Sequence, residues 1–201
     1  MDILMASTFN PLRFGIADGD KKEKLIKLLK DDSHFNINTI PLTSVSKKDK
    51  MFTTTDGDYI GNASWSGNCW TLINEAVVRG LIDSGEDELA ADLALKTVRD
   101  FNHNLSEFIN PFDGKGHGVI KYAWTASQYL ELLIEVVFGI SYDAENKEII
   151  ITPKLTEELK GEKLALENLA VTKDISLSLY IEGEKADYKV SGDSVKVKVI
   201  L

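Results

Sequence analysis

The spacing of apolar residues changes once along this chain of 201 residues, and the change limits which folds are open to it. From about residue 20 to 140 apolar residues recur at helical spacing, whereas from about 147 to 201 they alternate with polar residues. Residues 175–181 alternate strictly, as an antiparallel sheet with one wet face requires. The sequence therefore predicts a helical domain over residues 1–146 and a small antiparallel β module over residues 147–201.

The helical part predicts a hairpin of two neighbouring helices. Ser84 and Gly85 form a short turn, which makes the helices on either side of it antiparallel. Gly139 ends the last helix, which is apolar nearly all round and should be buried. The expected helices are residues 20–30, 68–83, 86–101 and 125–138, with a long loop at 33–66; the expected strands are 148–152, 166–171, 175–182, 186–191 and 195–201.

Charge and composition exclude several classes of partner. The formal net charge is -9, and an acidic surface argues against nucleic acid and anionic membranes as partners. No apolar run approaches the ~18 residues that cross a bilayer. Cys69 is the single cysteine, so no disulfide forms within the chain and a cytoplasmic location is expected. His34 and His103 lack partners at metal-ligand spacing, so neither a metal nor a cofactor is expected.

One segment near the middle of the chain carries most of the chemical information. A carboxylate is followed by Asn-Pro, a glycine-spaced loop and an aromatic helix start. A flexible loop beside a carboxylate and aromatic side chains can form a sugar-sized pocket with one ionisable group. On local chemistry alone, however, an ordinary exposed glutamate is the simpler interpretation. The segment reads Glu107-Phe108-Ile109-Asn110-Pro111-Phe112-Asp113-Gly114-Lys115-Gly116-His117-Gly118, then Tyr122-Ala123-Trp124.

A second segment, before the predicted hairpin, is rich in aromatic and small polar residues. Trp65, Gly67, Trp70 and Asn74 lie within it. Aromatic faces stack on sugar rings, and small polar side chains bind hydroxyl groups. Trp65 precedes the helix, which favours contact with substrate, whereas Trp70 lies inside the helix and is equally well interpreted as a core residue. His117 in the other segment could orient a hydroxyl or a phosphate, or be an exposed loop residue.

Both segments resemble signatures of the (α/α)6-toroid, or six-hairpin, glycoside hydrolases. The first resembles E-x-(Y/I)-N-P-x-(T/D)-G-x-G … W-(T/S)-A, and the second resembles Y-W-x-G-x-x-W-x-x-x-N. This group includes trehalase, processing α-glucosidase, mannosylglycerate hydrolase and debranching-type α-glucosidases. The glutamate that opens the first signature is the family's general base, so the resemblance implies that Glu107 is catalytic. The substrate-binding residues that it implies are Trp65, Gly67, Asn110, Lys115, His117 and Trp124.

The resemblance covers only the second half of the family's pattern. It implies a mainly α fold, a partial (α/α)6 toroid of antiparallel helical hairpins, followed by the small antiparallel β-sheet module. The family's general acid is an aspartate in the earlier half, and no matching motif occurs in this sequence. An incomplete toroid would expose the inner faces of its helices, so we expect a homo-oligomer or a partner chain that supplies the N-terminal half.

The implied activity is inverting hydrolysis of α-linked gluco- or manno-configured saccharides, in carbohydrate metabolism of the kind that includes glycogen debranching. Ser66 stands where the family commonly has an arginine, which points to a different substrate. The chain would carry the general base without the general acid, so alone it is expected to be inactive. The alternative is a non-catalytic carbohydrate-binding or assembly subunit, and a third interpretation is a phosphorolytic or transferase relative.

Overall fold

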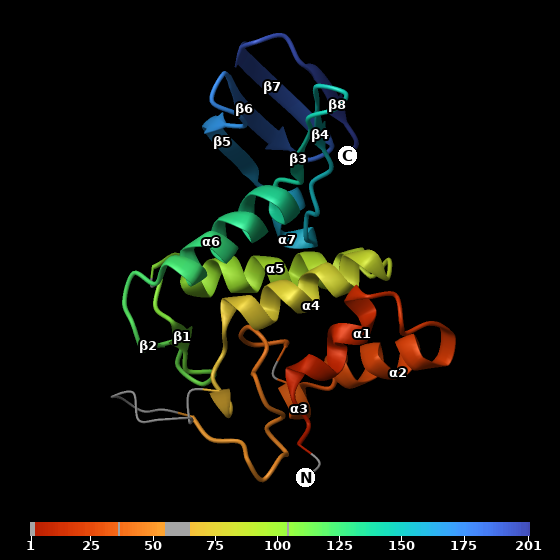
Figure 1. Cartoon of the computed structure of the whole chain (residues 1–201), viewed down its shortest axis with the longest axis vertical. Coiled ribbons are helices and arrows are strands. Elements are labelled where there is room, and N and C mark those ends of the chain that lie inside the picture. Colours follow the sequence, from red (N-terminus) through yellow and green to blue (C-terminus); the bar gives the residue numbers. More distant parts are fainter. Residues whose placement is uncertain (1–2, 36, 55–64, 104) are drawn as a thin grey trace. The chain divides into compact units, whose positions relative to one another are not determined.

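The computed structural model describes residues 3–35, 37–54, 65–103 and 105–201 of the chain (Figure 1). These residues form two compact units, Met1–Leu133 and Ile134–Leu201. The sequence placed the boundary later, after residue 146. The difference arises because a strand at Ile140–Asp143 pairs with the strand at Glu148–Ile151 and so belongs to the second unit. Within the described residues, no helix is long and apolar enough to cross a membrane.

Short helices open the first unit. They are η1 (Ala6–Phe9), α1 (Asn10–Arg13), α2 (Gly19–Lys30) and α3 (Asp32–Phe35). Helix α2 was predicted at nearly these bounds, and it buries Ile26 and Leu29 while its lysines face outward. Helix α3 lies inside what the sequence predicted as a long loop, and residues 55–64 of that loop lie outside the described residues.

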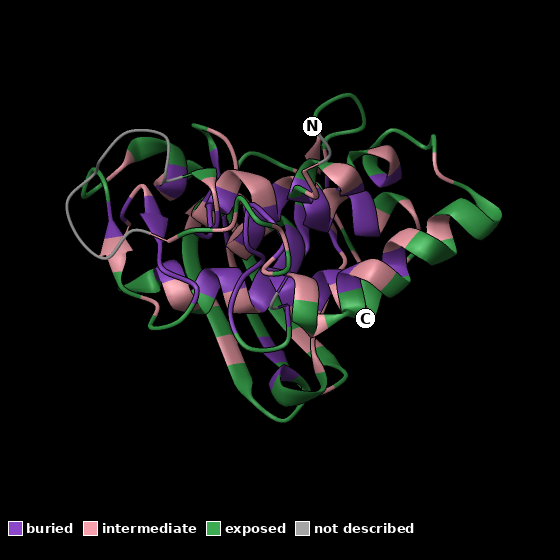
Figure 2. Cartoon of the chain, turned by 90° about the horizontal axis from the view of Figure 1, so that it is seen from below, coloured by how far each residue is buried: buried purple, intermediate pink, exposed green. Residues whose placement is uncertain are grey.

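An antiparallel helical hairpin forms the centre of the first unit, as predicted. Helices α4 (Thr71–Asp83) and α5 (Asp87–Asn102) are joined through Gly85, whose φ of +78° is a conformation that glycine adopts at little cost. Both helices are buried or half-buried along most of their length, and the helical part of the chain carries much of the buried colour in Figure 2. Gly80 of α4 lets helix α1 approach closely, since a Cβ there would lie 3.0 Å from the backbone nitrogen of Arg13.

The glycine-spaced segment after α5 folds back on itself. Strands β1 (Phe108–Ile109) and β2 (Gly116–His117) pair antiparallel, where the sequence predicted only a loop. Helix α6 (Ala123–Glu131) follows and continues as a π-helix, η3 (Leu132–Val137). The expectation that this helix is buried all round is wrong, because Trp124 and Leu130 are 48% and 51% exposed.

The second unit contains two three-stranded sheets. Strands β3 (Ile140–Asp143), β4 (Glu148–Ile151) and β8 (Lys196–Val199) form one, in the order β3-β4-β8. Strands β5 (Lys163–Ala170), β6 (Ile175–Glu182) and β7 (Lys185–Gly192) form the other, and the short helix α7 (Glu157–Lys160) precedes it. The alternation in β6 buries Ile175, Leu177, Leu179 and Ile181 on one face, as predicted.

The predicted fold class is wrong. Among the described residues 39% are helical and 24% lie in strands, so the chain is not a mainly α toroid fragment. The apolar spacing up to residue 140 hid the β1–β2 hairpin and strand β3. The second unit is also not purely antiparallel, because β4 and β8 pair in parallel. Pairing of segments nearly 50 residues apart depends on the tertiary structure, and the alternation of apolar residues does not specify whether two strands pair in parallel or antiparallel.

Candidate functional site

The two segments that the sequence singled out meet at the open end of the α4–α5 hairpin (Figure 1). Cys69, just before α4, exchanges two backbone hydrogen bonds with Ile109 of β1, at N–O distances of 2.9 and 3.0 Å. Helix α4 begins at this end and helix α5 finishes at it, so residues from both sides of the hairpin are brought together there. We call this region the open-end site and define it by Trp65, Trp70, Glu107, Phe108 and Trp124.

The carboxylate of Glu107 is anchored at one oxygen. Oε2 accepts a hydrogen bond from the backbone N–H of Val119, at 3.1 Å, and the N–H of Glu107 donates to the carbonyl of Val119, at 2.8 Å. The side chain is half-buried. Among the described residues, no hydrogen bond reaches Oε1. One oxygen therefore fixes the direction of the carboxylate while the other is available to a ligand or a water molecule.

Four rings form a continuous row beside Glu107. Trp65 stacks on Trp70 with ring centroids 3.8 Å apart and planes 9° apart. Trp70 contacts Phe108 at 5.0 Å, and Phe108 stacks on His117 at 6.2 Å. Trp65 is 40% exposed, whereas Trp70 is only 2% exposed. The row thus runs from solvent into the interior, and Trp65 is the ring on which a sugar could stack.

Gly67 and Asn110 shape the site from within. A Cβ on Gly67 would lie 2.5 Å from the carbonyl oxygen of Thr53, so glycine lets this segment cross closely. Asn110 is buried, and its Oδ1 accepts the N–H of Phe112 at 2.9 Å. Its own N–H donates to the carbonyl of Lys115, also at 2.9 Å. Both residues therefore hold loops in place, whatever contact they also make with a ligand.

The remaining predicted residues divide by exposure. Lys115 and Trp124 are exposed, whereas His117 is 8% exposed and belongs to the ring row. Trp124 lies near the glutamate, because the hydroxyl of the next residue, Thr125, donates to the carbonyl of Glu107 at 3.4 Å. The structure thus brings Glu107, Trp65 and Trp124 to an accessible surface. The binding roles of all six residues stay predictions.

Sequence reasoning missed two groups of residues at this hairpin. One is Val119, which together with Gly118 of the singled-out segment holds Glu107 in place. The second is an ion-pair network along α4, where buried Glu75 contacts Arg79 at 3.2 Å and Arg13 at 3.6 Å. Burial, and then the nearby Glu131 carboxylate, raise the pKa of Glu75 above its ordinary value, against the arginines. Only the spacing of Glu75 and Arg79, four residues apart on one helix, could have indicated the pair.

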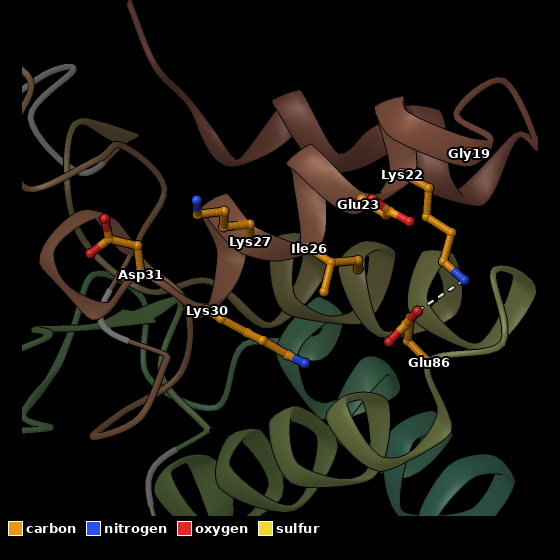
Figure 3. Close-up of a pocket in the computed structure, with 8 residues that line it drawn as sticks. All are labelled: Gly19, Lys22, Glu23, Ile26, Lys27, Lys30, Asp31 and Glu86. Atoms are coloured by element: carbon orange, nitrogen blue, oxygen red, sulfur yellow. Dashed lines mark ion pairs between the residues drawn. The ribbon is translucent and has the colours of Figure 1, made fainter.

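A separate depression in the first unit lies along α2 (Figure 3). Its volume is about 860 Å³. Lys22 crosses it to pair with Glu86 at 2.9 Å, at the turn that closes the α4–α5 hairpin. Since α5 has 16 residues, this turn lies roughly 24 Å along the helix from the open-end site. The lining residues are Gly19, Lys22, Glu23, Ile26, Lys27, Lys30, Asp31 and Glu86. These residues carry charges of both signs, and none of them is a predicted site residue.

Metal ligands are not grouped in the part of the chain that the structure describes: no cluster there has three or more His, Cys, Asp or Glu side chains able to hold an ion.

Comparison with solved structures gives relatives of the same fold. A GH63 mannosylglycerate hydrolase from Thermus thermophilus, in complex with glucose, is 23% identical with a TM-score of 0.54, over 66% of this chain and 31% of that one. The same enzyme in complex with Tris and D-glycerate is also 23% identical with a TM-score of 0.54, over 66% and 30%. An uncharacterized conserved protein from the same organism is 22% identical with a TM-score of 0.52, again over 66% and 30%.

The chain therefore spans about 31% of the length of the first of these relatives. No curated protein sequence matches it. Residues 2–125, which include the whole open-end site, match the family described as the mannosylglycerate hydrolase MGH1-like glycoside hydrolase domain. This match confirms the resemblance to the six-hairpin glycosidases. The chain belongs to the family of mannosylglycerate hydrolase MGH1-like glycoside hydrolase domains.

Proposed function

We propose that this chain supplies the general base of a glycoside hydrolase that inverts the configuration of α-linked gluco- or manno-configured saccharides. Glu107 is the base in this proposal, and the observation that carries it is the geometry of its carboxylate. Oε2 is held by Val119 at 3.1 Å, which leaves Oε1 to take a proton from the attacking water. A general base must be positioned within hydrogen-bond reach of the proton that it takes.

Sugar recognition in this proposal depends on the exposed rings of the site. Trp70 covers one face of the Trp65 ring, so the other face of that ring is the one that stacks on the apolar face of a sugar. Trp124 and Lys115 contact the substrate from the exposed part of the segment, and Gly67, Asn110 and His117 keep the pocket in shape. Solved relatives of this fold are described with glucose and with D-glycerate. We therefore infer a hexose in the pocket and a small hydroxy acid or second sugar as the leaving group.

Inverting hydrolysis also needs a general acid roughly 6.5–9.5 Å from the base. We propose that this acid comes from a part of the domain outside these 201 residues, which a partner chain supplies. The support is the limited coverage of the solved relative, about 31% of its length. The chain alone should then be inactive. A cytoplasmic setting is part of the same proposal.

The test is Glu107→Gln in the assembled enzyme. Turnover of mannosylglycerate and of α-linked glucosides should fall at least about 10²-fold, because the amide cannot accept the proton of water. The unfolding midpoint should stay unchanged, since glutamine can still accept the N–H of Val119. Glu88→Gln is the matched control, because Glu88 is exposed at the closed end of the hairpin. Unchanged turnover in Glu107→Gln would refute the assignment.

A second candidate function is a non-catalytic carbohydrate-binding or assembly subunit. The exposed ring of Trp65 favours it, because stacking on a sugar needs no general acid. Binding of maltose or mannose by the isolated chain, with no hydrolysis on addition of any candidate partner chain, would support this function. Hydrolysis on addition of a partner would exclude it.

A further inference from the structure

Gly118 lies directly against the side chain of Glu107. Its φ is +73°, a conformation that residues with side chains rarely adopt. A Cβ added there would lie 2.6 Å from Oε2 of Glu107, 2.8 Å from its Cβ and 2.9 Å from Cε1 of Phe108. All three distances are shorter than real side chains show. The carboxylate therefore occupies the space that a side chain at position 118 would fill.

The residue after Gly118 provides the hydrogen bonds that hold the glutamate. Val119 donates its N–H to Oε2, at 3.1 Å, and its carbonyl accepts the N–H of Glu107, at 2.8 Å. The left-handed backbone of Gly118 sets the direction in which the chain enters Val119. Two properties of one glycine, its missing Cβ and its positive φ, thus act on the same carboxylate.

We propose that Gly118 is a positioning residue for Glu107: the missing side chain lets the carboxylate lie against the backbone and accept the Val119 N–H. The role rests on the proposed function of Glu107 as the general base. A side chain at position 118 displaces Oε2 and breaks its hydrogen bond. A displacement of ~1 Å at a reacting group can lower turnover ~10²-fold.

Gly114 offers a matched control in the same segment. Its φ is +68°, close to that of Gly118, but a Cβ there meets nothing within 4 Å. Alanine therefore costs a similar backbone strain at both positions. Only alanine at position 118 also pushes on Glu107. Any difference between Gly118→Ala and Gly114→Ala measures the contact with the carboxylate and not the strain of the loop.

The first measurement needs no activity. Amide hydrogen exchange of Val119, followed by NMR in the folded chain, reports whether its N–H is still bound to Oε2. Exchange should be about tenfold faster in Gly118→Ala than in Gly114→Ala, since one hydrogen bond is lost only in the former. Equal exchange rates in the two variants would overturn the proposal, whether or not Glu107 is the base.

The second measurement is turnover of the assembled enzyme. Gly118→Ala should lower kcat by about 10²-fold with KM little changed, whereas Gly114→Ala should retain activity. In a Glu107→Gln background Gly118→Ala should add little, because both changes act through one group. If Glu107→Gln lowers turnover and Gly118→Ala does not, the positioning role is refuted. If Glu107→Gln has no effect, the proposed function fails, and the exchange of Val119 alone decides whether Gly118 positions the carboxylate.

Discussion

The two ends of the α4–α5 hairpin differ in what they offer a ligand. The closed end borders the depression of about 860 Å³ along α2, and charged side chains line it. The open end presents a row of aromatic rings and a carboxylate anchored at one oxygen. The depression makes the closed end a second candidate for a ligand site. For the proposed function the chemistry favours the open end, because sugars stack on aromatic faces and glycoside hydrolysis uses a positioned carboxylate.

One charged pair at the closed end is already formed within the protein. Lys22 pairs with Glu86 at 2.9 Å and also donates to the carbonyl of Ser84. Partly exposed pairs of this kind contribute only ~0–1 kcal/mol. At the open end, by contrast, Trp70 is buried among other rings, so the geometry there depends on packing. A packed end can hold a catalytic group in place better than a solvated, charged end can.

Replacement of the buried tryptophan should give the largest effect on stability. Trp70→Ala removes the ring between Trp65 and Phe108, and loss of a fully buried tryptophan costs ~3–5 kcal/mol of unfolding free energy. Urea denaturation of the folded chain measures this loss. Trp65→Ala is the matched control, since the same ring at 40% exposure buries less apolar area and should cost less, about 2 kcal/mol. Equal losses would mean that the row is not graded from solvent to core.

Trp65→Ala also tests sugar binding separately from folding. Trp65→Ala should weaken sugar binding by about tenfold, because an aromatic stacking contact contributes ~0.5–1.5 kcal/mol. Titration calorimetry with a saccharide that the wild type binds measures this change. Undiminished affinity in Trp65→Ala would show that sugars stack elsewhere, and Trp124 would then be the next ring to replace.

Local chemistry made the hairpin predictable from the sequence. Apolar spacing located α4 and α5, and Gly85 marked their turn because only a residue tolerant of positive φ fits there. The motifs around Glu107 and Trp65 were recognisable for a similar reason, since each is a local run of residues with its own turn-forming and aromatic residues. Strict alternation located β6 in the same way.

Pairings between distant segments were not predictable. Nothing in the alternation of residues 195–199 states that β8 joins β4 in parallel. The π-helical turns of η3 interrupt a run of apolar residues that reads as a regular helix. The contact between Gly118 and Glu107 joins residues eleven positions apart through a hairpin that only tertiary structure reveals. Because such long-range pairings were not foreseen, the predicted helical content was too high. The predicted site also did not include the contacts that support Glu107.

Between the two ends, Glu75 should make stability depend on pH. Its pKa is raised above the ordinary value of 4.5, first by burial and then by Glu131. The folded state therefore binds the proton more tightly than the unfolded state, and the free energy of unfolding falls as pH rises from about 4.5 through the folded pKa. Glu75→Gln, which is neutral throughout, removes this decline. Urea midpoints of both proteins between pH 4 and 8 test it.

The expected sign is specific. The variant should gain stability relative to wild type as pH rises, and the gain should vanish at the acid end, where Glu75 carries its proton in both states. The opposite trend, with wild type gaining on the variant as pH rises, would mean that Arg13 and Arg79 outweigh burial and lower the pKa. The network would then stabilise the charged form.

The smallest effect is expected at the closed end of the hairpin. Lys22→Met keeps the aliphatic part of the side chain but removes the pair with Glu86, at 2.9 Å. The unfolding free energy should change by ~1 kcal/mol or less, because both partners are partly exposed and water replaces the lost contact. Sugar binding and turnover should not change, because the pair lies roughly 24 Å from the open-end site along α5. Loss of either at unchanged stability would mean that the depression along α2 takes part in function, and the comparison between the two ends would have to be reversed.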